Sequence, residues 1–475
     1  MTTLPPSTRA TASRIWSLCN VLRGDGISYN QYIAELTYLL FLKVAEENGA
    51  ESSLPEGYRW KDLVSYDGPN LLGHYQEMLT HLGTSSETKM VRDIFAFPTT
   101  VFSHSENLRV VINGLNAIQW NQISEDGLGQ IYEALLAKNS EDARSGAGQY
   151  FTPRALVDCI VSIVKPTLGE LIQDPATGTG GFLISADAYV RATHTQEAYE
   201  DSPPQYEGVE IERGTYRLCL MNVFLHRMNA SLSLGDALTE DGSHLKPADV
   251  IVANPPFGAK SGSVRATRDS FSYSSSNKQL EFLQHIYQSL KPGGRAAVVL
   301  PDNVLFEEGV ARQIRRELME LCSLHTILRL PTGIFYAQGV KTNVLFFTRG
   351  HDDKGNTKEI WIYDLRTAAP KFGKKNPLTS SYFAEFISSF GKWPHLESVS
   401  EDRVENERFK RFDRNFLSAT NENLDIHWLT EEQESDEYEG LRPDEISALV
   451  LVSLGSLIKD VEDLHMELNV TEDDQ

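Results

Sequence analysis

The sequence predicts an α/β protein with a doubly wound, mostly parallel sheet, a helical N-terminal domain and a helical C-terminal tail. Residues 1–138 carry helical apolar patterns, residues 139–368 alternate short β-branched runs with longer helical ones, and residues 369–475 are mixed and polar. Alternation of strands and helices is typical of a parallel sheet with helices on both faces. We therefore expect three domains with limits at these positions.

Seven short apolar runs are the expected strands of the sheet. They cover residues 171–173, 208–210, 231–234, 249–253, 296–300, 326–330 and 343–347. Residues 291–294 and 302–308 are expected turns. Helices are expected at 32–42 and 131–136, and the polar stretch between these two helices predicts no clear element. Ligands of such sheets bind outside the carboxyl ends of the strands.

The composition is that of a globular protein, with 41% hydrophobic and 23% charged residues among 475. Four cysteines lie far apart, without a CxxC pair or a zinc-ligand spacing, which indicates free thiols in a reducing cytoplasm. The N-terminus lacks the apolar core of a secretion signal, and no apolar run is long enough to span a bilayer. We expect a cytoplasmic protein that binds neither a membrane nor a metal.

The acidic charge is concentrated at the C-terminal end. Of the net charge of −22, residues 421–475 contribute −15, from 17 acids and 2 bases, which leaves −7 for the other 420 residues. In the same region, apolar residues recur at spacings of 4, 3, 4, 3 and 4, at Val450, Leu454, Leu457, Val461, Leu464 and Leu468. This seam indicates a helix that packs either on the core of its own chain or against another subunit.

Two segments indicate contacts to a ligand through the backbone. In the segment 148–154, Thr152 and Pro153 are a good N-cap and first-turn pair for a helix at 155–164. The pair either simply starts this helix or also holds the carboxylate of a ligand near backbone N–H groups. The segment 174–183 follows a strand and has three clustered glycines, which allow a sharp turn and close approach of a ligand. It is neither a GxGxxG fingerprint nor a Walker loop.

Polar residues follow three further strands. Glu210, at the end of the second strand, is suited to bind two ribose hydroxyls, and Asp236, after the third, to accept from an adenine amino group. Together they imply a ligand that contains adenosine. Asn254-Pro255-Pro256-Phe257 follows the next strand, and its two prolines end the ladder and expose carbonyls. The Asn254 amide oxygen and the Pro255 carbonyl would accept from an NH2 group, and Phe257 would stack on a flat base.

In this order, FTP, DPATGTGGF, GVE, GDAL and NPPF resemble the amino-methyltransferases with the γ order of motifs. The flanking segments 23–43, 148–154, 289–302 and 339–347 resemble the modification subunits of Type I restriction-modification systems, over residues 15–365. The resemblance implies a Rossmann-like methyltransferase sheet and S-adenosylmethionine as the methyl donor. It assigns the cofactor to Gln149, Tyr150, Phe151, Thr152, Pro153, Arg154, Asp174, Thr179, Gly180, Gly181, Glu210 and Asp236.

The resemblance also implies the reaction, which is methylation of N6 of adenine in DNA. Asn254, Pro255, Pro256 and Phe257 would hold the target adenine after it is flipped out of the duplex, and Phe306 is our candidate for a second aromatic wall. Methyl transfer is then mostly a positioning problem that requires no metal and no dedicated general base. The loop 258–270 carries Lys260, Arg265 and Arg268, which we expect to contact phosphates, in a loop that is mobile without DNA.

The resemblance implies several partners. The chain has no broadly basic DNA-binding domain, so we expect a specificity subunit to read the DNA sequence. A second copy of the modification subunit and an optional restriction (motor) subunit are also implied. Two alternatives stay open: a scaffold that binds DNA or a partner without catalysis, and a methyltransferase that acts on a glutamine amide in a protein. The intact motifs disfavour the first, and the long helical N-terminal domain disfavours the second.

Overall fold

The computed structural model describes most of the chain. The described residues are 6–23, 27, 29–49, 51, 54–120, 123, 125–142, 152–258, 268, 270–335, 340–367, 369–370, 372, 376, 378–393 and 403–429. The chain divides into two compact units, Met1–Ile426 and His427–Gln475. The predicted terminal seam lies outside the described residues.

The N-terminal region is helical, as predicted. Its helices are α1 (Pro6–Ser17), α2 (Cys19–Arg23), α3 (Tyr29–Glu47), α4 (Trp60–Ser65), α5 (Pro69–Ser85), α6 (Lys89–Ile94), α7 (Ser105–Asn116) and α8 (Glu125–Asp142). The predicted helices at 32–42 and 131–136 lie within α3 and α8. Helix α3 is apolar and buried around most of its circumference, because it lies between α8 and α12 (Arg213–Leu225), a helix that packs on the sheet. Four of these helices, α4 to α7, occupy the polar stretch for which the sequence predicted no element.

The sheet has nine strands in the order β3-β2-β1-β4-β5-β7-β6-β8-β9. Their bounds are β1 Leu171–Asp174, β2 Gln205–Glu210, β3 Ala230–Leu234, β4 Ala248–Ala253, β5 Leu290–Pro301, β6 Cys322–Leu330, β7 Thr342–Arg349, β8 Glu359–Asp364 and β9 Phe409–Asp413. The seven predicted strands lie within β1 to β7. Strands β1 to β5 pair in parallel, β7 is antiparallel to β5 and β6, β8 is parallel to β6, and β9 is antiparallel to β8. The prediction of a doubly wound, mostly parallel sheet is confirmed.

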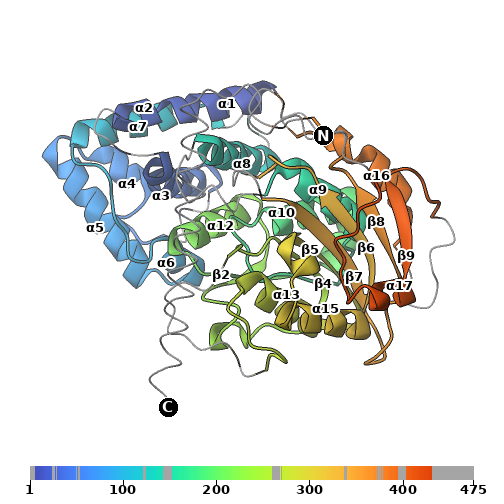
Figure 1. Ribbon diagram of the computed structural model, residues 1–475. Helices are drawn as coiled ribbons and strands as arrows, with labels where there is room; N and C mark the ends of the chain where they lie inside the picture. The colour runs from blue at the N-terminus through green and yellow to red at the C-terminus, as the bar shows by residue number, and fades with distance from the viewer. Residues whose placement is uncertain are drawn as a thin grey trace, which may run out of the picture. The chain divides into compact units, whose positions relative to one another are not determined.

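Helices cover both faces of the sheet. Figure 1 shows α12, α9 (Arg154–Val164) and α10 (Gly181–Thr193) on the face toward the N-terminal helices, and α13 (Lys278–Ser289) and α15 (Val310–Leu321) on the other face. The remaining elements are α11 (Gln196–Asp201), η4 (Glu240–Gly242), α14 (Asn303–Phe306), η5 (Ser380–Phe383), α16 (Ala384–Phe390) and α17 (Arg414–Ala419). No helix among the described residues has the length and apolar character needed to cross a membrane.

Two predicted turns have a different structure. Residues 291–294 lie within β5, where the register with β4 shifts between Ala248 and Val250. A Cβ at Gly294 would lie 2.8 Å from the Ala248 carbonyl oxygen, so the irregular pairing requires glycine there. The other predicted turn, 302–308, contains the short helix α14. The predicted domain limits stay predictions, although β9 joins the sheet from beyond residue 368.

Candidate active site

The predicted ligand segments meet at one edge of the sheet. Asp174 and Glu210 are the last residues of β1 and β2, and Asn254 directly follows β4. These strands are parallel neighbours in the sheet, and Asp236 follows the adjacent β3. The carboxyl ends of parallel neighbours lie at the same edge, which is where such sheets bind ligands. The order of the motifs along the chain therefore becomes an order across the sheet.

The glycine-rich loop after β1 forms hydrogen bonds to the end of β2. The Thr177 backbone N–H donates to the Val209 carbonyl at 3.0 Å, and the Gly178 N–H donates to Glu210 Oε2 at 2.9 Å. A Cβ at Gly208 would lie 2.2 Å from Thr177 Cγ2, so this approach needs a glycine in β2. Gly178 and Gly180 have φ angles of 55° and 85°, in the region that favours glycine. The loop then enters α10 with Gly180 as its N-cap.

Two buried carboxyl groups lie beneath this loop. Asp174 Oδ1 accepts from the Ala176 N–H at 3.0 Å, and Glu210 Oε1 accepts from the Glu212 N–H at 2.8 Å. Burial raises the pKa of Asp174 to about 8, and the nearby Glu210 carboxylate adds to this shift. Burial also raises the pKa of Glu210, against the bonds from the Glu212 and Gly178 N–H groups. Burial therefore favours the neutral forms of both acids, which can exchange hydrogen bonds with a hydroxyl-bearing ligand.

Asp236 lies farther along the same edge. It is half-buried, and its Oδ1 accepts from the Leu238 N–H at 3.0 Å. This bond orients the carboxylate while leaving lone pairs of both oxygens for other donors. The position is compatible with the predicted contact to the cofactor's adenine, which stays a prediction.

The FTP segment contacts the turn 254–257, which was predicted to be catalytic. Thr152 was predicted as the N-cap of the following helix, and this prediction is wrong, because α9 begins at Arg154 with Pro153 as N-cap and no side-chain cap. The Thr152 hydroxyl instead accepts a 2.9 Å hydrogen bond from Asn254 Nδ2. A polar bond thus joins the predicted cofactor segment to the predicted target-base segment.

Arg154 forms ion pairs with two acidic residues of this chain. Its guanidinium pairs with Asp158, at 2.9 Å between Nε and Oδ1, and with Glu133 of α8. This arrangement supports the junction between α8 and α9 and does not favour direct contact with a cofactor. The predicted residues Gln149, Tyr150 and Phe151 lie outside the described residues.

The turn 254–257 presents an aromatic ring next to a second one. Asn254 and Pro255 are buried after β4, whereas Phe257 is half-buried. The Phe257 ring lies edge to face with Phe335, with centroids 6.4 Å apart and planes at 72°. Phe335 lies between β6 and β7, and we did not predict its role. Phe306 is 44% exposed at the end of α14, and its role as a second aromatic wall stays a prediction.

The exit of the turn is held by α13. The Gly258 N–H donates to Gln279 Oε1 at 3.0 Å, and the Gly258 carbonyl accepts from the Lys278 N–H at 3.2 Å. Gln279 is buried, and its Nε2 donates to Asn303 Oδ1 at 3.4 Å. The turn 254–257 is therefore held at its start by the bond between Asn254 and Thr152, and at its exit by the bonds of Gly258 to α13.

Of the three predicted DNA-contacting residues, only Arg268 is described. Its guanidinium donates to the Gly242 carbonyl at 3.1 Å and lies 2.6 Å from His285 Nδ1. Its backbone N–H donates to the Leu238 carbonyl at 3.0 Å. These bonds favour a role in anchoring the end of the loop over phosphate binding. Lys260 and Arg265 lie outside the described residues.

Comparisons with known proteins agree with this geometry. A family model described as N-6 DNA Methylase matches residues 123–437, and one described as HsdM N-terminal domain matches residues 11–115. The Type I restriction enzyme StySPI methylase subunit of Salmonella potsdam is 42% identical and covers 96% of this chain and 94% of its own length. The EcoKI methylase subunit of Escherichia coli strain K12 is 41% identical, with 97% and 96% covered.

Solved structures give the same result. The crystal structure of the EcoKI M protein matches with a TM-score of 0.56 and 38% identity, over 97% of this chain and 96% of that one. A chain from a study of complex assembly and conformational transition of the type I R-M system matches with a TM-score of 0.75 and 28% identity, over 99% and 100%. The chain therefore belongs to the N-6 DNA methylase family, among the methylase subunits of Type I restriction enzymes.

Proposed function

We propose that this chain transfers a methyl group from S-adenosylmethionine to N6 of a flipped-out adenine in double-stranded DNA. It would do so within a complex that contains a specificity subunit, a second copy of this chain and, optionally, a restriction subunit. The observation that carries the proposal is the bond between Thr152 and Asn254, at the sheet edge where Glu210 supports the glycine-rich loop. It joins the cofactor motif to the target-base motif.

The residues at this edge fit S-adenosylmethionine. A Cβ built at Gly178 or Gly181 would meet nothing within 4 Å, so the loop leaves room for a ligand against its backbone. Glu210 already accepts from two backbone N–H groups and keeps lone pairs for ribose hydroxyls. The buried carboxyl groups of Asp174 and Glu210 suit the hydroxyl groups of a ribose. Thr179, Gly180, Gly181 and Asp236 complete the proposed site.

The chain's own residues would orient the base. When bound, S-adenosylmethionine supplies an electrophilic methyl group. The Asn254 amide oxygen and the Pro255 carbonyl would accept from N6, which directs its lone pair at the methyl carbon. Phe257 would stack on the base and offset part of the cost of flipping it, which is a few kcal/mol, and Phe335 supports the Phe257 ring edge to face. Transfer would leave the C–S bonding electrons on sulfur, and N6, cationic once methylated, would release its proton to solvent.

Methyl transfer from radiolabelled S-adenosylmethionine to DNA tests the proposal. The chain is assayed alone, with the specificity subunit encoded beside it, and with Asn254→Ala in place of the wild type. We expect label on adenine only with the partner, and a loss on the order of 100-fold or more in the variant. Label on protein instead of DNA would support the glutamine alternative. Cofactor binding without any transfer would support the scaffold alternative.

A further inference from the structure

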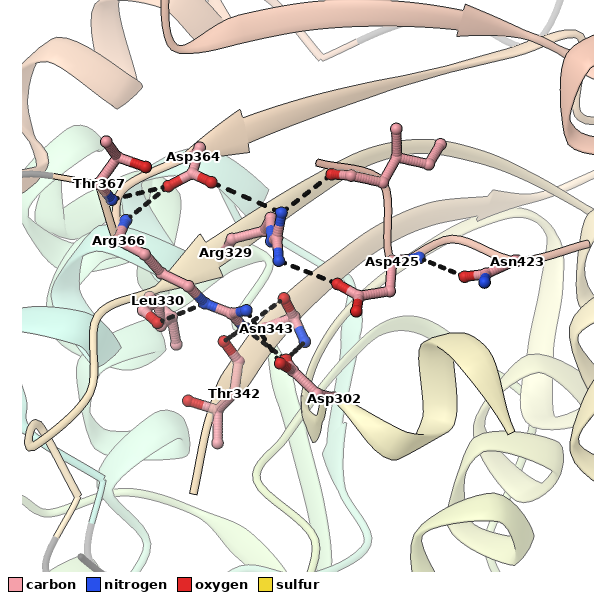
Figure 2. Close-up of polar contacts among 11 residues, drawn as sticks. Asp302, Arg329, Leu330, Thr342, Asn343, Asp364, Arg366, Thr367, Asn423 and Asp425 are labelled. Carbon is pink, nitrogen blue, oxygen red and sulfur yellow. Dashed lines mark hydrogen bonds and ion pairs between the residues drawn. The ribbon is translucent and has the colours of Figure 1, made fainter. Parts of the chain in front are cut away.

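Arg366, a buried arginine that follows β8, forms hydrogen bonds to residues at the ends of β5, β6 and β7. The Arg366 guanidinium donates to five oxygen atoms, which belong to Leu330, Thr342, Asn343 and both carboxylate oxygens of Asp302. Figure 2 shows these side chains turned toward one another. The side chains of Arg366 and Asp302 are only 8% and 16% exposed. Charged hydrogen bonds of this kind are strong and geometrically specific away from water.

The acceptors of Arg366 are the two ends of one segment. Leu330 is the last residue of β6 and Thr342 the first of β7, and the segment between them, 331–341, contains Phe335. Arg366 Nε donates to the Leu330 carbonyl and Nη2 to the Thr342 carbonyl, each at 3.0 Å. The Arg366 guanidinium therefore joins the two ends of the segment that contains Phe335, whose ring contacts Phe257.

Asp302 ties the end of this segment to the strand beside the catalytic turn. It directly follows β5, which pairs with β4, and its N–H donates to the Lys341 carbonyl at 3.0 Å. Its Oδ1 also accepts from Asn343 Nδ2 at 2.7 Å. Asp302 therefore fixes the end of the segment 331–341 relative to β5. Strand β5 pairs with β4, the strand that precedes residues 254–257.

Arg366 is itself held rigidly. Its backbone N–H donates to Asp364 Oδ1 at 2.8 Å, and the Thr367 N–H donates to the same oxygen at 3.0 Å. The other Asp364 oxygen lies 3.5 Å from the Arg329 guanidinium. Arg366 is therefore held both through its backbone and through its guanidinium. A lysine ammonium could not form the same planar set of hydrogen bonds.

We propose that Arg366 and Asp302 are a positioning pair for the target-base pocket. They touch neither base nor cofactor, and they set the distance between Phe335 and Phe257 by closing the base of the segment 331–341. The inference rests on the proposed function, because it assumes that an adenine stacks on the Phe257 ring, which Phe335 supports edge to face. The pair would control how well the flipped base is held, and hence the rate of methyl transfer, without affecting cofactor binding.

The test uses the full chain with the specificity subunit and two duplexes. One is a duplex that the wild-type complex methylates, and it reports the rate of methyl transfer. The other is the same duplex with 2-aminopurine, which has no N6 amino group, in place of the target adenine, and it reports base flipping only. A rise in 2-aminopurine fluorescence reports the flipped base. We expect Arg366→Lys and Asp302→Asn each to reduce this rise and to slow single-turnover methyl transfer about 10- to 100-fold, as sub-ångström misplacement does. Affinity for S-adenosylmethionine should be unchanged.

Arg403→Lys is the matched control. Arg403 is also buried, but it bonds His325 and Thr326 in the middle of β6, away from Leu330, together with the Phe390 carbonyl. Both arginine variants should lower the melting temperature, and only Arg366→Lys should lower the fluorescence rise and the rate. Equal effects of the two variants on fluorescence and rate would reduce Arg366 to a structural role and overturn the inference.

A double variant tests the route through the aromatic ring. If Arg366 acts through Phe335, Phe335→Ala combined with Arg366→Lys should be no slower than Phe335→Ala alone, whereas independent effects would multiply. Multiplied effects would contradict the inference. A wild-type complex that gives neither fluorescence rise nor methyl transfer would instead defeat the proposed function itself.

Discussion

At the scale of single residues, Asp174 couples the cofactor site to pH. Its pKa is raised to about 8 by burial, so this carboxyl is neutral in the folded protein at pH values where it is ionised in the unfolded chain. A raised folded-state pKa contributes stability that is present at low pH and lost as pH rises toward the folded value. The loss is about 1.4 kcal/mol per pH unit for one group.

The variant Asp174→Asn keeps the shape of the protonated acid and cannot ionise. We expect its unfolding free energy, relative to the wild type, to increase steadily between pH 5 and about 8, and the difference to level off above that. Chemical denaturation of both proteins across this range measures the difference. Parallel stability profiles would show that Asp174 titrates normally.

The candidate site also shows what a sequence can indicate at this scale. Asn254, Glu210 and Asp236 were predicted because each follows a strand, and the ends of parallel strands meet. Phe335 and Arg366 were not predicted, because their contacts depend on how distant segments pack. Thr152 was misassigned because its cap signal is local, whereas its bond to Asn254 is not.

At the scale of elements, the loop after the catalytic turn is predicted to bind DNA. Replacement of Lys260 and Arg265 together by alanine should weaken DNA binding uniformly across sequences. It should also reduce the slope of log affinity against log salt by about 2. Cofactor affinity should not change. The measurement is DNA affinity of the complex over a range of salt concentrations.

Arg268→Ala is the contrasting variant for this loop. Because Arg268 bonds Gly242 and lies against His285, we expect its loss to reduce stability more than the salt slope. An unchanged salt slope in the double variant would exclude Lys260 and Arg265 from phosphate contacts.

Helix α3 contains a buried carboxyl group that holds the N-terminal region together. Glu35 is 2% exposed and accepts from Tyr75 Oη at 2.5 Å, Thr100 Oγ1 at 3.1 Å and the Val101 N–H at 2.8 Å. Glu35→Ala should lower the unfolding free energy by about 2–4 kcal/mol, because it leaves these buried donors without their acceptor. Glu77→Ala is the control, since Glu77 also accepts from a tyrosine but at the surface. Similar losses in both variants would contradict the prediction.

The elements themselves were predictable to different degrees. Strands such as β4 and β5 were found because buried strands contain continuous apolar runs. Strand β9, with the sequence FKRFD, was missed, because charged residues are typical of an edge strand and mask its pattern. The antiparallel direction of β7 is a long-range property that its own residues do not encode.

At the scale of the whole molecule, the first compact unit ends with the segment 422–426, which forms hydrogen bonds to residues of α14, α15 and β6. Arg315 donates to the Glu422 carbonyl at 2.8 Å, the Leu424 N–H donates to the Leu305 carbonyl at 3.0 Å, and Arg329 donates to the Ile426 carbonyl at 2.9 Å. Residues 422–426 are therefore part of the catalytic unit, although they carry the same acidic character as the tail that follows.

This boundary predicts opposite results for two truncations. A chain that ends after residue 430 keeps every bond of the segment 422–426. It should therefore melt at the wild-type temperature and bind S-adenosylmethionine, whereas a chain that ends after residue 421 should be less stable. The longer truncated chain has lost the acidic tail and the predicted seam at 450–468, so it should fail to co-elute with the specificity subunit in size-exclusion chromatography. For the full-length chain, high salt should weaken the complex if the tail's charge contributes. Co-elution of the chain 1–430 at wild-type levels would place the docking surface elsewhere on the first unit.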